Sequence, residues 1–136
     1  MSPSGKEESK GKWPSDLILE LYSSLLAEMW EIVSALVGEA ILGLLFASAI
    51  LQIGQKHPFL LSLRVSEEGI AFEGVNEKCR TMAPLEIHQG FHSLVNHLFH
   101  LFSVLTVGVI NKELFPRAFP RLKEAERIIS QSRGLR

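Results

Sequence analysis

The chain has 136 residues, of which 46% are hydrophobic and 21% charged, and its formal net charge is −1. This length suits one domain with a core of its own, and the low net charge excludes a protein that attracts nucleic acid through its overall field. Cys79 is the only cysteine, which excludes a disulfide framework, a zinc finger and a CxxCH haem attachment within one chain. A lone thiol fits a reducing compartment, so we expect a soluble, cytoplasmic protein.

The charges are unevenly distributed along the chain. Residues 13–111 carry four Lys or Arg against ten acids, whereas residues 112–136 carry seven Lys or Arg against three acids. A basic tail of this kind is typical of a solvated helix face. It is also compatible with a protein partner or an anionic surface that binds the tail.

The first residues differ in composition from the rest. Residues 1–12 are mainly Ser, Gly, Lys and Glu, which predicts a disordered leader without the apolar stretch of a secretory signal. Residues 13–136 are expected to form a single helical domain. Its first helix should begin near Ser15, because serine caps helix N-termini well.

A long apolar helix is predicted over residues 15–54, where hydrophobic residues recur at three- and four-residue steps. Within it, residues 33–53 contain one charge, Glu39, and are apolar on nearly every side. Such a segment belongs in the core of an oligomer or in lipid, and Glu39 should then be buried with it. Gly38 is a point at which this helix could bend.

A β-hairpin insert is predicted at about residues 60–75, since apolar and polar residues alternate over 60–66 and again over 69–75. Residues 76–83 are expected to form a loop. A second long helix is predicted over about 85–113, because proline at 84 suits a helix start. Phe115-Pro116 should stop it, and a third, shorter helix is predicted over about 117–132.

Together these elements predict a mainly α fold. Two long antiparallel helices are joined by a β-hairpin excursion and followed by a short C-terminal helix. One chain then offers too few elements to cover the first helix on every side. We therefore expect a homodimer, a dimeric helical bundle with a four-helix core.

A candidate metal site follows from this arrangement. If residue 54 lies near residue 84, Glu39 faces a stretch flanked by His97 and His100. One carboxylate and two imidazoles form a ligand set suited to a divalent metal, and the same helix could instead line a haem or ligand pocket. A third interpretation is a polar core cluster that fixes the register of the helices.

Two further signals are less specific. His88 and His92 are four residues apart, a spacing compatible with metal binding but also common for a pair on a helix surface. Cys79 stands between Lys78 and Arg80, whose charges could lower the pKa of its thiol. Without a base of its own, this cysteine is more often inert.

The sequence contains no Gly-rich phosphate loop, no GxSxG and no CxxC. It therefore favours a non-enzymatic sensory, regulatory or scaffold module that works through its dimer core, with no nucleic acid partner. One alternative is a metal- or haem-binding protein that uses Glu39, His97 and His100. Another is a small membrane protein with spans at residues 33–53 and 93–110.

Overall fold

The computed structural model describes residues 14–66, 68–106 and 109–134, so the predicted leader, residues 1–12, lies outside the described residues. The fold is mainly helical with one small antiparallel sheet, as predicted. In chain order the elements are α2 (Pro14–Val37), α3 (Glu39–Ile53), the 3-10 helix η1 (Pro58–Ser62), β1 (Arg64–Ser66), β2 (Gly69–Ala71), α4 (Glu73–Cys79), α5 (Pro84–Thr106) and α6 (Val109–Gly134).

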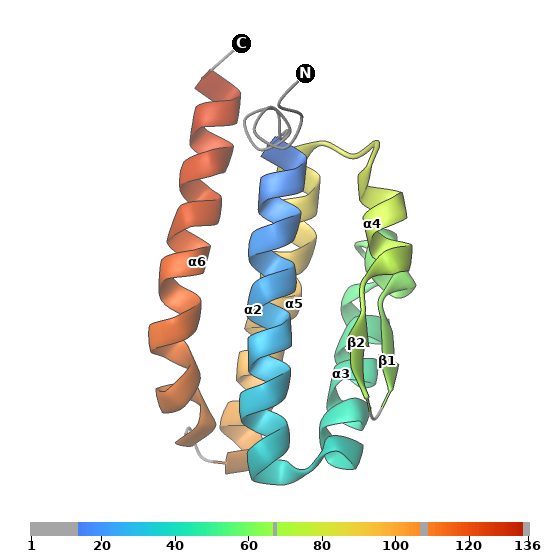
Figure 1. The fold of residues 1–136 in the computed structure, drawn as a ribbon, viewed down its shortest axis with the longest axis vertical. Coiled ribbons are helices and arrows are strands. Elements are labelled where there is room, and N and C mark those ends of the chain that lie inside the picture. Colours follow the sequence, from blue (N-terminus) through green and yellow to red (C-terminus); the bar gives the residue numbers. More distant parts are fainter. Residues whose placement is uncertain (1–13, 67, 107–108, 135–136) are drawn as a thin grey trace, which may run out of the picture.

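Four long helices lie side by side and share one core. The pair α2 and α5 lies at the centre, with α6 along one side and α3 along the other (Figure 1). The sheet and α4 lie on the α3 side, where β1 contacts α3, and β2 and α4 contact α2. Every helix contributes buried apolar side chains to this core, the largest being Tyr22, Phe46, Phe91 and Phe102.

The predicted helix 15–54 is wrong in one respect, because Gly38 divides it into α2 and α3. Gly38 has φ +93° and ψ 151°, a conformation that only glycine adopts without strain. Its N–H still donates to the Ser34 carbonyl at 2.9 Å, and its own carbonyl accepts from the Leu42 N–H at 3.1 Å. A single residue therefore reverses the chain with little loss of hydrogen bonding, and α3 folds back beside α2 (Figure 1).

This reversal changes how α2 is covered. Its apolar side meets α3, α5 and α6 of the same chain, so residues such as Ile18, Leu26 and Val33 are fully buried. Trp30 packs edge-on against Phe46 of α3, with ring centroids 5.4 Å apart. The four-helix core that was predicted for a dimer is thus built within one chain, and the prediction that one chain could not cover this helix is wrong for α2.

The hairpin is shorter than predicted. Arg64 pairs with Ala71 and Ser66 with Gly69, but the chain before and after the strands is helical. Phe59 and Leu60 of η1 are buried. In place of the predicted loop 76–83, α4 buries Val75 and Cys79. These two residues are four apart, a helical spacing that brings both to the same side of α4.

The predicted stop at Phe115-Pro116 is also wrong, because α6 runs through both Pro116 and Pro120. Each internal proline costs a helix about 3 kcal/mol. Packing offsets this cost, since apolar side chains at helical spacing are buried against α2 and α5 on both sides of the prolines; these are Leu114, Ala118, Ala125, Ile128 and Ile129. The second long helix ends at Thr106 rather than near residue 113, and residues 107–108 lie outside the described residues.

The segment 33–53, which the sequence offered as a membrane span, is divided at Gly38 and leaves a 15-residue α3. In the part of the chain that the structure describes, no helix combines the length and the apolar character needed to cross a bilayer.

Candidate functional site

The three residues of the predicted metal site do not form a buried cluster. Glu39 is exposed, because it opens α3 directly after the reversal at Gly38. A carboxylate in the first turn of a helix is stabilised by the helix dipole and needs no buried partner. On α5, His100 is exposed and His97 half-buried. The prediction that Glu39 is hidden in the core is therefore wrong.

The helix register also differs from the expected one. A helix pair in which residue 54 faces residue 84 would place Ser93 near residue 45, whereas Ser93 lines a pocket with Gln52, Ile53 and His57. Among the described residues, no group of three or more His, Cys, Asp or Glu side chains could hold a metal ion. The structure thus does not assemble the predicted ligand set within one chain.

A different histidine takes part in a partly buried polar contact. The Tyr22 hydroxyl of α2 lies 2.9 Å from Nδ1 of His88 on α5. The Tyr22 ring stacks on Phe91, with centroids 5.3 Å apart and planes 13° apart. His88 in turn stacks on His92 at 5.3 Å. The two histidines that the spacing singled out therefore lie together, and the sequence did not indicate their tyrosine partner.

Burial sets the protonation of this contact. It raises the pKa of Tyr22, and the charge of Glu126 adds to the effect. Burial lowers the pKa of His88, as does the charge of His92, while Glu126 acts in the opposite direction. At neutral pH a protonated Tyr22 hydroxyl thus shares a hydrogen bond with an uncharged His88, and the tautomer of the imidazole decides which of the two donates. Tyr22 is 1% exposed, and its hydrogen bond with His88 links α2 to α5.

We expect this pair to make stability pH-dependent. A folded-state pKa below the ordinary value near 6.5 means that unfolding favours proton uptake by His88, so its contribution is present above pH 6.5 and is lost as the pH falls below that value. His88→Gln keeps a hydrogen-bond acceptor but does not titrate, and it should flatten the loss of unfolding free energy between neutral and mildly acidic pH. Urea unfolding at neutral pH and at mildly acidic pH measures the unfolding free energy of each protein. His100→Gln, on the same helix, is the control. If the unfolding free energy of wild type and of His88→Gln fell equally with pH, His88 would not be the source of the pH dependence.

The thiol of Cys79 is buried in the core, and burial raises its pKa to about 11. The prediction that Lys78 and Arg80 lower this pKa is wrong. The thiol is therefore protonated at neutral pH, and it is a poor nucleophile.

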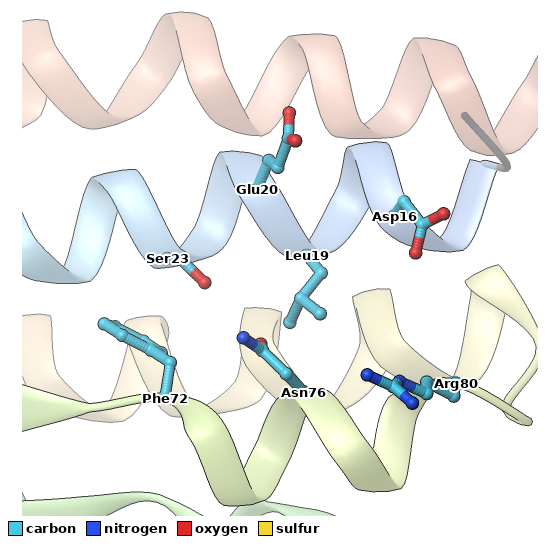
Figure 2. Close-up of a pocket in the computed structure, with 7 residues that line it drawn as sticks. All are labelled: Asp16, Leu19, Glu20, Ser23, Phe72, Asn76 and Arg80. Carbon is cyan, nitrogen blue, oxygen red and sulfur yellow. The ribbon is translucent and has the colours of Figure 1, made fainter. Parts of the chain in front are cut away.

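An open groove of about 530 Å³ lies between α2 and α4. Figure 2 shows Leu19 pointing across it toward Asn76, with Asp16 and Arg80 near one end and Glu20 turned toward another helix. Its remaining lining residues are Ser23 and Phe72. The Arg80 guanidinium also lies 3.8 Å from the Glu77 carboxylate on the surface. The groove is thus open to solvent and carries charged side chains of both signs. Such a surface is better suited to binding a polar partner than to enclosing a substrate.

The side of α3 that faces away from the core is an exposed apolar surface. We call it the α3 outer face; it consists of Ala40, Ile41, Leu44, Ala47, Ser48, Leu51 and Gln52. Leu44 is 73% exposed, Leu51 62% and Ile41 49%, and residues 40–55 contain no charge. A surface helix normally carries charged residues on its solvent side. An uncharged apolar side of this kind marks an interaction surface.

A second exposed surface lies on α6, where the sequence indicated a basic tail but not an aromatic surface. The triplet Phe115-Pro116-Arg117 recurs at once as Phe119-Pro120-Arg121. This four-residue period, close to one helical turn, aligns the two Phe, whose rings lie 5.3 Å apart. It also aligns the two Arg, which both bind Glu28 of α2, at 2.6 and 2.8 Å. The repeat itself was the signal that could have revealed this surface.

No known protein family, curated protein or solved structure matches the chain.

Proposed function

We propose that the protein is a non-enzymatic regulatory or scaffold module that works in the cytoplasm as a homodimer, joined through the α3 outer face. The observation that carries this proposal is the exposed, uncharged row of apolar side chains on α3. The non-enzymatic part is supported by the buried Tyr22 hydroxyl and the protonated Cys79 thiol. The reduced, buried cysteine supports the cytoplasmic location.

The spacing along the α3 outer face favours a helical partner. Ile41, Leu44, Ser48 and Leu51 follow one another at alternating steps of three and four residues. This is the spacing of a coiled-coil seam, in which each side chain fits between four side chains of a facing helix. Ala40 and Ala47 border the seam and would allow two helices to approach closely.

A second copy of the chain fits this seam well. Two copies related by a twofold axis present the same surface to each other, and an uncharged surface meets itself without like-charge repulsion. Further exposed apolar side chains near the ends of α2 and α5 could extend the contact, namely Leu36, Val104 and Leu105. These helix ends lie at the same end of the bundle as the start of α3 (Figure 1).

Sedimentation equilibrium of the full chain in buffer without detergent tests the proposal. At micromolar concentrations we expect a mass twice the 15.2 kDa of one chain, with dissociation on dilution. A mass of one chain throughout the micromolar range would refute the homodimer. A monomer that acquires the doubled mass only in detergent would refute it equally.

A further inference from the structure

The N-terminal half of α6 carries an exposed aromatic surface bordered by cations. We call it the FPR face; it consists of Phe115, Pro116, Phe119, Pro120 and Lys123, all exposed on the outer side of the helix. Phe115 is 55% exposed and Phe119 45%. The ammonium of Lys123 lies 5.5 Å from the centroid of the Phe119 ring. Two large apolar rings thus face water beside a positive charge.

Cations predominate in the part of α6 that carries the FPR face. Residues 114–123 contain three cations and no acid. Arg117 and Arg121 are held on one flank by Glu28, and hydrogen bonding from Arg117, and then from Arg121, lowers the pKa of that carboxyl. The side chain of Arg117 nonetheless stays 52% exposed. One acid bound by two arginines leaves the flank cationic. Acids follow directly after Lys123. Glu124 and Glu126 line a pocket with Pro120 and Lys123, and Glu124 pairs with Arg127. The excess of cations is therefore confined to residues 114–123.

We propose that the FPR face docks on an anionic lipid surface. Phe115 and Phe119 would enter the boundary between headgroups and acyl chains, while Lys123 and Arg117 would remain at the level of the lipid phosphates. Aromatic side chains beside cations on an exposed helix are the combination that binds such interfaces. Neither the phenylalanine rings nor the cations need a partner of defined geometry, and all of these side chains are exposed.

The ring arrangement favours lipid over nucleic acid. Stacking on a base requires a free aromatic face. The Phe119 ring lies beside the Phe115 ring and beneath the Lys123 ammonium, so a stacking base would have to compete with these contacts. Burial in a lipid interface needs only apolar area and leaves these contacts in place.

The inference is independent of the proposed homodimer. The helices α6 and α3 lie on opposite sides of the central pair α2 and α5 (Figure 1). A second copy on the α3 outer face would therefore leave the FPR face free, and a monomer would carry the same surface.

Co-sedimentation of the full chain with vesicles tests the inference. We expect binding to phosphatidylcholine vesicles that contain phosphatidylserine, much weaker binding to phosphatidylcholine alone, and loss of binding at high salt. The double variant Phe115→Ser/Phe119→Ser should weaken binding about tenfold or more. Circular dichroism checks that it folds, and Lys123→Glu offers a second variant that keeps both rings and should also weaken binding to the anionic vesicles.

Matched controls distinguish the FPR face from other surfaces. Leu44→Ser/Leu51→Ser removes the same kind of exposed apolar groups from α3, and it should leave vesicle binding in place. Binding that is lost in this α3 variant but kept in the phenylalanine variant would overturn the inference. So would equal binding to neutral and anionic vesicles, no vesicle binding at all, or binding to a single-stranded oligonucleotide in its place.

Discussion

Replacing Leu44 and Leu51 together by lysine should convert the proposed dimer into a monomer of unchanged fold. Both side chains project from the α3 outer face into solvent in the single chain, so the substitution costs the core nothing. In the dimer each copy would bring two ammonium groups into an apolar seam opposite two more, at a cost of several kcal/mol. We expect the dissociation constant to rise more than about 100-fold. Light scattering coupled to size exclusion measures the mass, and circular dichroism measures the fold.

The matched control for this variant is Leu85→Lys. Leu85 is also an exposed leucine on a helix, but it lies at the start of α5, away from the α3 outer face. The control should keep the dimeric mass. A double lysine variant on α3 that still has the wild-type mass would contradict the assignment of the interface to α3.

Replacing Gly38 by alanine should destabilise the fold, whereas the same change at Gly43 should stabilise it. A Cβ on Gly38 would meet nothing within 4 Å, so the effect comes from the backbone alone. An alanine at φ +93° is expected to cost about 1–3 kcal/mol. Gly43 lies inside α3, where a Cβ would meet Trp30 at 3.9 Å, an ordinary contact, and alanine there should add about 0.5–1 kcal/mol.

Urea unfolding of the two alanine variants measures this difference. We expect the change in unfolding free energy to have opposite signs in the two variants, although both replace glycine by alanine and the positions are five residues apart. A Gly38→Ala variant that is not destabilised would contradict the reversal of the chain at Gly38. A stabilised Gly38→Ala would favour the continuous helix over residues 15–54 that periodicity alone predicts.

The sequence predicted the helical class and most helix positions, because apolar periodicity reports which side of each helix is buried. The sequence did not predict the helix ends correctly where a single residue or tertiary packing decides whether a helix ends or continues. Gly38 lies within an unbroken helical pattern, and its positive φ is revealed only when α3 packs beside α2. Pro116 should end a helix, but the buried residues on both sides hold α6 together. Propensity is a weak signal at such positions.

The candidate site was less predictable than the fold. Glu39 was expected to be buried because its neighbours are apolar, yet periodicity does not say which side of α3 is left uncovered. The spacing of His88 and His92 indicated a shared helix side, but their contact with Tyr22 depends on α2 and α5 meeting in one register. The FPR repeat was present in the sequence, and its two prolines drew attention to a helix end instead of a surface.

Cross-linking through Ser48→Cys tests most directly whether two α3 outer faces meet. Ser48 lies in the middle of the seam, so a twofold axis through its centre brings the two cysteines together whether the helices run parallel or antiparallel. Cys79 is buried and should not react, and Ser24→Cys supplies an exposed control on α2. Under mild oxidation at micromolar concentration, we expect a disulfide-linked dimer from Ser48→Cys and little from Ser24→Cys. Equal or absent cross-linking in both variants would contradict the proposal that a second copy covers α3.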